Sequence, residues 1–433
     1  MLHRKMSTVF ILLFIALPVV VAAMPRFPHP EFVSGYEVPT AQHPITRTIV
    51  WEIADVALLV LALSLITYLA LRRRSRRGVM LTSLACLAYF GFYREGCVCA
   101  VGSLQNVTLA MADSSVAVPL TVLAFFLLPL AFTLLFGRTF CAGVCPLGAV
   151  QDLVILKPLA VPRALDKALR MVPVIYLTAA VLLAATGTTF LICRWDPFVA
   201  FFRLDGPSSI VLFGVILLLL GMIVARPYCR YLCPYGVLLG WMSFLSRWRV
   251  SITPSACIDC RLCEESCPFG SILQPSAGDA PGAAAGASRR LLALLMLLPV
   301  LVAAGVWVGH AAAAPLSRFD ASVSMAHLLQ KDEEHRTEED TTRIDAFRAS
   351  GTTEDALLAR AASQQDRIHR GALWAGGFLG LVFGVQLLLL SWGKRRDAYE
   401  QDRTTCFSCG RCFEACPHDA SHRLGPPAEG GER

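Results

Sequence analysis

The stretch CIDCRLCEESCP at residues 257–268 has a counterpart in CFSCGRCFEACP at residues 406–417. Both follow the pattern C-x2-C-x2-C-x3-C-P, the spacing in which cysteine thiolates bind [4Fe–4S] clusters. Zinc also binds Cys-x2-Cys pairs, but it rarely uses three cysteines in tandem plus a fourth before a proline. The eight cysteines therefore predict two [4Fe–4S] clusters, which hold and pass single electrons.

The ligands of each cluster are expected to come from both runs. In ferredoxins with two such runs, the fourth cysteine of each run binds the cluster of the other run. Applied here, cluster 1 is held by Cys257, Cys260, Cys263 and Cys416, and cluster 2 by Cys406, Cys409, Cys412 and Cys267. The spacing thus predicts one ferredoxin-like module that is split between two chain segments.

The composition predicts a protein embedded in a membrane. The chain of 433 residues is 55% hydrophobic and 16% charged, and its mean hydropathy of +0.57 is unlike that of soluble domains. Hydropathy predicts about eight helical spans near the ~20 residues that a bilayer requires, at 8–23, 50–71, 79–93, 117–136, 171–191, 209–225, 291–310 and 372–391. The first could instead be a signal peptide, because a basic start precedes its apolar run. The expected fold class is an α-helical polytopic membrane protein.

Basic residues beside the spans account for the net charge of +7, so no nucleic-acid partner is expected. They gather at 72–77, 163–170, 289–290 and 394–396. By the positive-inside rule these segments face the cytoplasm. The prediction is a multi-pass protein of the bacterial cytoplasmic (inner) membrane. Its two ferredoxin runs are separated by an even number of crossings and meet on the cytoplasmic side.

Two shorter motifs form a weak internal repeat. GRTFCAGVCPLG (137–148) and ARPYCRYLCPYG (225–236) share an arginine, an aromatic residue, Cys-x3-Cys-Pro and a glycine at equal spacing. Each is predicted at the inner end of a span, which would bring Cys141, Cys145, Cys229 and Cys233 together. Four thiolates there could bind a further iron–sulfur cluster or another metal, or form redox-active pairs. The plainer alternative is that they are buried packing residues.

The remaining candidate residues are less informative. Cys97, Cys99 and Cys193 are predicted at the outer face, as a metal or cofactor site or as a structural disulfide. No histidine lies in the middle of a predicted span and no Cys-x2-Cys-His motif occurs, so haem is not expected. No catalytic residue is predicted, and an electron-transfer subunit is favoured over a stand-alone enzyme.

These features divide the chain into five parts. Residues 1–48 are expected to form an N-terminal anchor or signal with a short periplasmic segment, and residues 49–250 a membrane core that contains both short motifs. Residues 251–275 are the first half of the ferredoxin module and 401–433 the second half. Between them, 276–400 is predicted to be a membrane hairpin whose periplasmic loop, 312–370, contains a charged helix.

The motifs together resemble the NosR/NapH group of membrane iron–sulfur proteins, with the closer likeness to NosR, the accessory protein of nitrous oxide reductase. The resemblance is carried by FYREGCVCAVGSLQNV, GRTFCAGVCPLGAVQDLVILKP, RPYCRYLCPYGVLL, DAFRASGTTEDALL, RGALWAGGFLGLVFG and CFSCGRCFEACPHD. NosR proteins also have a periplasmic flavin domain with FMN attached to a threonine. Here only residues 24–48 lie outside between the first two predicted spans, so no covalent FMN is expected in this chain.

The resemblance implies a respiratory role. It suggests a carrier that relays electrons across the cytoplasmic membrane to a periplasmic reductase, as in nitrous oxide reduction. Two alternatives stay open, a redox-responsive regulator or maturation factor for nitrous oxide reductase, and a NapH-like quinol dehydrogenase subunit. The implied partners are membrane lipid, a cytoplasmic donor or the quinol pool, a separate FMN-binding protein and a periplasmic copper reductase. Besides the two clusters, a further metal centre and a quinone are candidate cofactors.

Overall fold

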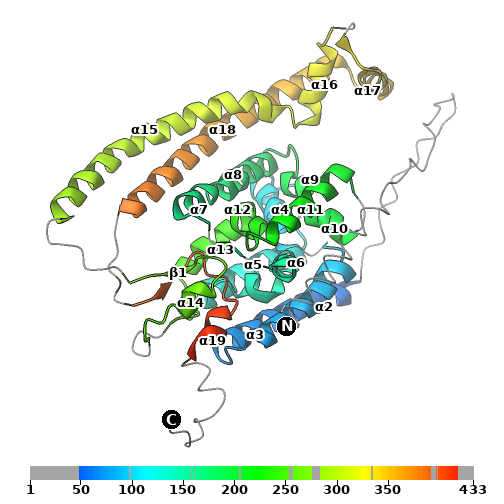
Figure 1. The fold of residues 1–433 in the computed structure, drawn as a ribbon. Coiled ribbons are helices and arrows are strands. Elements are labelled where there is room, and N and C mark those ends of the chain that lie inside the picture. The colour runs from blue at the N-terminus through cyan, green and yellow to red at the C-terminus, as the bar shows by residue number, and fades with distance from the viewer. Residues whose placement is uncertain are drawn as a thin grey trace, which may run out of the picture.

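The computed structural model describes residues 48–96, 99–156, 158–159, 161–203, 206–252, 257–275, 283–332, 335–391, 396 and 398–417. These residues are mostly helical, and their strands form a two-stranded sheet. The predicted first span at 8–23 and Cys97 lie outside the described residues. Figure 1 shows a helical bundle, a small module with β1, α14 and α19 at one end of it, and a long helical hairpin along one side.

Four of the described helices are long and apolar enough to cross a membrane, namely Ile49–Leu71, Ala164–Ala185, Leu291–Ser317 and Glu354–Leu389. They overlap four of the predicted spans, which supports the expected helical membrane architecture. Two shorter apolar helices, Leu120–Phe136 and Ser208–Gly221, overlap two more. The predicted span at 79–93 is α3 (Arg76–Cys86), which runs on into the π-helix η2 (Leu87–Tyr93). The total of about eight spans stays a prediction.

The bundle contains helices that hydropathy did not predict. Its longer members are α2 (Ile49–Leu71), α4 (Ala100–Ala112), α5 (Leu120–Phe136), α8 (Val172–Ala185), α11 (Ser208–Gly221) and α13 (Pro234–Phe244). Of these, α4 and α13 match no predicted span. Helix α4 packs against α5 and α8 and buries Val101 and Leu104. Because α4 starts at Ala100 and folds back into the bundle, Cys99 is placed inside the helical core.

Short helical segments carry the two repeated motifs and the turns around them. They are the π-helix η3 (Phe140–Val144), α6 (Pro146–Val154), α7 (Arg163–Leu169), α9 (Leu191–Trp195), α10 (Pro197–Arg203) and α12 (Pro227–Tyr231). Both α6 and α13 begin with a proline immediately after a cysteine. Proline is favoured at this first helical position because its missing N–H would have no partner there. The Cys-Pro pairs therefore mark two helix starts.

A hairpin of two long helices separates the two ferredoxin runs in sequence. It consists of α15 (Ala283–Ser317) and α18 (Glu354–Ser391), joined by α16 (Ala321–Leu329) and α17 (Glu338–Ala349). The predicted loop at 312–370 is thus largely helical, since both long helices continue beyond their apolar segments. The predicted charged helix is α17, which begins with a capping box between Thr337 and Asp340. In Figure 1 the open ends of the hairpin lie on the same side as β1, and α16 and α17 lie at the other end.

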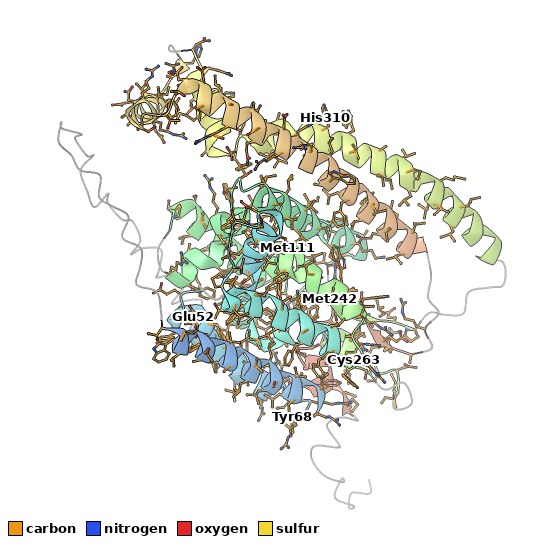
Figure 2. All side chains as sticks on the ribbon, turned by 180° about the vertical axis from the view of Figure 1, so that it is seen from behind. Glu52, Tyr68, Met111, Met242, Cys263 and His310 are labelled. Atoms are coloured by element: carbon orange, nitrogen blue, oxygen red, sulfur yellow. The ribbon has the colours of Figure 1, made fainter. Side chains whose placement is uncertain are left out.

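Glycines allow the two hairpin helices to approach closely. A Cβ on Gly305 would lie 2.2 Å from the carbonyl oxygen of Gly376, and a Cβ on Gly376 would lie 2.1 Å from that of Gly305. No side chain fits at either position. Nearby, Nδ1 of His310 and Nε2 of His369 are 2.8 Å apart. Figure 2 shows His310 on the hairpin above the bundle and Cys263 in the module at one end of the bundle.

The two ferredoxin runs meet in the small module. It contains α14 (Leu262–Glu265), β1 (Ile272–Leu273), β2 (Glu400–Gln401) and α19 (Arg411–Ala415). The strands pair antiparallel, with Ile272 opposite Gln401. The rings of Phe269 and Phe407, each next to its run's cysteines, have centroids 4.8 Å apart. The chain therefore comes back, after the hairpin, to the first ferredoxin run.

Candidate metal centres

The second ferredoxin run and the last cysteine of the first run surround one small cavity. Cys406, Cys409, Cys412 and Cys267 all line it, and these are the four ligands that the exchange rule assigns to cluster 2. Burial raises the pKa of the Cys406 thiol to about 12. A thiolate at this position therefore needs a bound cation, which makes the donor set suitable for an iron–sulfur cluster.

The first run has a more open position. Cys257 and Cys263 are half-buried and Cys260 is exposed. Cys416, assigned to the same cluster, is half-buried just after α19. Among the described side chains, no group of three or more Cys, His, Asp or Glu residues already converges to metal-ligand distances. The ligand assignments therefore rest on chain order and, for cluster 2, on the shared cavity.

The backbone gives both runs the same unusual loop. Asp259 and Ser408 stand just before the second cysteine of their runs and both have a φ of 52°. Arg261 and Gly410 stand just after it, with φ values of 63° and 78°. Non-glycine residues rarely adopt this left-handed region, and such strain gathers at functional sites. The matched loops were not predicted, because the cysteine spacing carries no information on φ.

The structure brings the four cysteines of the two short motifs together around the start of two helices. Cys141 lies on η3 and Cys145 directly precedes α6, while Cys229 lies on α12 and Cys233 directly precedes α13. We call Cys141, Cys145, Cys229 and Cys233 the quartet. Cys145 and Cys233 therefore each stand at the N-terminus of a helix, where the helix dipole favours a thiolate.

Hydrogen-bond donors point at three of the quartet's sulfurs. Nε2 of Gln151 donates to Sγ of Cys229 at 3.2 Å, and the backbone N–H of Gly236 donates to Sγ of Cys233 at 3.3 Å. Nη2 of Arg138 donates to Sγ of Cys141 at 3.8 Å. Hydrogen bonds to sulfur are a means by which proteins set the potential of iron–sulfur clusters. The donor set thus fits a thiolate-bound metal centre.

The quartet lies directly against the second ferredoxin run. The guanidinium of Arg138 stacks over the ring of Phe407 at 4.4 Å, and its Nη1 donates to the carbonyl of Thr404 at 3.0 Å. One residue thereby contacts both the quartet and the residue that follows Cys406. The two candidate centres are neighbours, a relation that the sequence motifs did not reveal.

Two of the predicted outer cysteines lie at different depths, since Cys99 is half-buried and Cys193 is exposed. Cys97 lies outside the described residues, but Cys99 and Cys193 come together as free thiols. A Cβ on Gly102 would lie 3.4 Å from Sγ of Cys193 and 3.9 Å from Cβ of Cys99. Cys99 also lines the same apolar cavity as Cys145 of the quartet. One cavity therefore joins two sites that were predicted at opposite faces, because α4 turns back into the bundle.

Buried polar residues surround this cavity. Asp196 lines it and accepts a hydrogen bond from the hydroxyl of Tyr228 at 3.3 Å. Asp55, which is 2% exposed, pairs with Arg94 at 2.8 Å and accepts from the hydroxyl of Tyr89 at 2.7 Å. Each buried carboxylate thus has a partner, as buried charges require.

A larger groove opens between the bundle and the hairpin. Its volume is about 540 Å³, which is within the range of pockets that bind small molecules. Apolar residues of α13 and α18, among them Trp241, Phe378 and Leu381, form most of its wall. Cys229 and Cys233 of the quartet and Phe407 of the ferredoxin module also line it. An apolar ligand in this groove would lie beside both candidate centres.

Comparison with known proteins agrees with the motifs. Two matching families are both described as "4Fe-4S binding domain", one over residues 118–161 and 205–253 and the other over 250–273 and 399–421. The first contains the quartet and the second contains the ferredoxin runs. YccM of Escherichia coli, whose name assigns it provisionally to electron transport, is 29% identical over 39% of this chain and 52% of its own length. The chain therefore contains two 4Fe-4S binding domains, and we refer to it below as the polyferredoxin.

Two relatives of this polyferredoxin come from Paracoccus denitrificans. Protein NirI is 30% identical over 46% of the polyferredoxin and 31% of NirI. The methylamine utilization ferredoxin-type protein MauN is 32% identical over 39% of the polyferredoxin and 60% of MauN. The alignments thus span between about a third and three fifths of these relatives. No solved structure matches the polyferredoxin.

Proposed function

We propose that this polyferredoxin relays single electrons across the bacterial cytoplasmic membrane to a periplasmic reductase system, in a respiratory pathway of the nitrous oxide type. The observation that carries the proposal is the contact of one side chain, Arg138, with both Cys141 of the quartet and Phe407 of the ferredoxin module. Electron transfer needs neighbouring centres, and this contact joins the two cysteine systems of the chain.

The proposed route has three stages. Electrons enter at the ferredoxin module, whose [4Fe–4S] clusters supply one-electron storage when bound. They pass to the quartet beside Phe407, and then along the apolar cavity that runs from Cys145 to Cys99. Cys99 and Cys193 mark the end that faces the periplasmic partner. In this scheme the chain's own residues hold the centres, set their spacing and keep water out of the cavity.

Iron analysis and electron paramagnetic resonance of anaerobically purified protein test the cofactor content. The ligand count predicts about twelve iron atoms if the quartet holds a third [4Fe–4S] cluster, and about eight if it does not. Replacing Cys145 and Cys233 by serine should remove about four of the twelve. Protein without any coupled [4Fe–4S] signal would contradict the proposal.

Liposomes test the transmembrane step. With a reductant trapped inside and an impermeant oxidant outside, the wild-type protein should transfer electrons across the bilayer, and the variant C145S/C233S should not. Wild-type liposomes that transfer no faster than protein-free liposomes would rule out the relay.

A regulator or maturation factor for nitrous oxide reductase is the alternative from a different class. The variant C260S distinguishes the two, because Cys260 belongs to the exposed first run. A relay loses electron delivery to the reductase in vitro. A regulator keeps that delivery and loses only the expression or metal loading of the reductase.

Quinol oxidation is a second candidate, and the groove favours it. Trp241, Phe378 and Leu381 offer apolar walls to a quinone ring and tail, and Arg170 and Arg230 lie at the same groove. Cys229 and Cys233 would then hold a centre that can accept electrons from a membrane-soluble donor. Steady-state oxidation of a short-chain quinol by the purified protein tests this candidate.

A further inference from the structure

Two arginines at equivalent places in the short motifs each reach into the opposite motif. Arg138 and Arg226 both stand three residues before the first cysteine of their own motif. A Cβ on Gly236 would lie 3.3 Å from Nη2 of Arg138, and a Cβ on Gly148 would lie 3.4 Å from Nη1 of Arg226. Since the two glycines are also equivalent in the repeat, the halves exchange their arginines reciprocally.

The same region contains more buried positive than negative charge. Asp152 pairs with Arg76 at 2.6 Å, with Arg226 at 3.2 Å and with Arg411 at 3.3 Å. Arg138 adds a fourth guanidinium that is 5% exposed. We call Arg76, Arg138, Arg226 and Arg411 the arginine cluster. The single negative charge of Asp152 offsets only part of the positive charge of the arginine cluster.

Arg138 is the member for which no carboxylate partner is found among the described residues. Its hydrogen bonds go to the carbonyl of Thr404 and to Sγ of Cys141, and its buried Nε has no hydrogen-bond partner. A buried guanidinium without an anion nearby is strongly unfavourable. The group with which it forms a hydrogen bond and which can become anionic is the thiol of Cys141 in the quartet, and the thiol of Cys406 in the ferredoxin run is also close. Neutral thiols would offer no compensation.

The arginine cluster lies between the two cysteine systems. Nη1 of Arg226 donates to the carbonyl of Cys141 at 2.6 Å, and Nη1 of Arg76 donates to the carbonyl of Cys409 at 3.2 Å. The guanidinium of Arg226 also lies 5.5 Å from the ring centre of Phe407. Positive charge is therefore concentrated where electrons would pass from one centre to the other.

We propose that the arginine cluster is the counter-charge of an anionic, thiolate-bound centre in the quartet and raises its reduction potential, with Arg138 as the positioning residue. This inference rests on the proposed function, because it requires a metal centre in the quartet. Reduction adds negative charge, which a buried cation stabilises in a medium of low dielectric constant. The field of the arginine cluster therefore makes a centre in the quartet easier to reduce.

The test is a redox titration followed by electron paramagnetic resonance on the full-length protein. The variant C145S/C233S first identifies the quartet signal by its loss. R138Q should then shift the midpoint potential of that signal to more negative values at unchanged iron content, and R138K should restore most of the wild-type value. D152N, which removes the carboxylate paired with three members of the cluster, should shift it in the opposite direction. R348Q is the control, because Arg348 is an exposed arginine of α17.

Two results separate the possible failures. An unchanged midpoint in R138Q at full iron content overturns the inference and leaves the proposed function intact. If R138Q does not fold, D152N decides once limited proteolysis shows that its module stays docked, since an unchanged or lowered midpoint in that variant also overturns the inference. Retention of all iron and all signals in C145S/C233S would instead refute the quartet centre and the proposed relay with it.

Discussion

Oδ2 of Asp152 lies 2.6 Å from Nη2 of Arg76, which also donates through Nη1 to the carbonyl of Cys409. Asp152 belongs to α6, next to the quartet, and Cys409 belongs to the second ferredoxin run. Arg411 on α19 reaches the same carboxylate at 3.3 Å. This carboxylate therefore helps to attach the carboxyl-terminal half of the ferredoxin module to the helical bundle, alongside the hydrogen bonds from Arg138 to the carbonyl of Thr404 and from Ser243 to the carbonyl of Arg403.

Replacing Asp152 by alanine should weaken the attachment of the module to the bundle. The change leaves three guanidiniums without their shared anion, and breaking a buried ion pair costs about 3–5 kcal/mol. Limited proteolysis of the detergent-solubilised protein should cut the carboxyl-terminal segment faster than in the wild type. D166N is the matched control, since Asp166 pairs with Arg170 and Arg230 and does not contact the module. Equal cleavage of D152A and D166N would contradict the prediction.

The ionisation of Asp152 determines how the docking of the ferredoxin module onto the bundle should depend on pH. Burial opposes ionisation, but Arg226, Arg76 and Arg411 hold the pKa of Asp152 well below its usual range. Because the pKa of this carboxyl is lower in the folded than in the unfolded protein, its ionisation stabilises the folded state at pH values above the unfolded pKa of about 3.9. This stabilisation is lost only as the pH falls through the lower pKa of the folded state. Docking should therefore persist down to about pH 4. Rapid proteolysis of the carboxyl-terminal segment already at about pH 5 would speak against it.

The exchange of fourth ligands can be tested with single serine variants. C267S should abolish the same paramagnetic signal as C406S, because both cysteines line one cavity. C416S should abolish the signal that C260S removes. Each variant should lose about four iron atoms. If C267S instead abolishes the signal that C260S removes, each run binds its own cluster.

If quinol binds in the groove, a larger side chain in its wall should weaken quinol binding. Val382 of α18 lines it, whereas the neighbouring Phe383 does not. V382W should reduce the apparent affinity for a short-chain quinol roughly tenfold, which is about 1.4 kcal/mol, because the larger ring fills the space. F383W should have no effect, and electron transfer from dithionite should be unchanged in both. Equal quinol kinetics in the two variants would exclude the groove.

Neighbouring glycines in the hairpin should tolerate alanine very differently. A Cβ on Gly376 meets the backbone oxygen of Gly305 at 2.1 Å, whereas a Cβ on Gly377 meets only the side chain of Val306, at 3.2 Å. G376A should cost about 1–3 kcal/mol through overpacking, and G377A much less. Thermal unfolding in detergent measures both. A G376A variant as stable as G377A would show that the helices can separate at this point without cost.

The sequence predicted the cysteine runs and the helical membrane architecture because both depend on local patterns. Ligand spacing and long apolar segments can be read without knowing the tertiary fold. The depth of Cys99 could not be predicted in this way, since α4 is too short and too polar to register as a span. The approach of the Arg138 side chain to Gly236 of the opposite motif could not be predicted either, because it depends on how the two motifs pack.

The hairpin also constrains the order in which the protein can mature. Residues 257–267 leave the ribosome before α15, and residues 406–416 leave it after α18. The cavity shared by Cys267 and Cys406 cannot close until both long helices are in place. The four thiols of this cavity are therefore complete only after α18 has been made, because a chain that stalls before α18 lacks three of them.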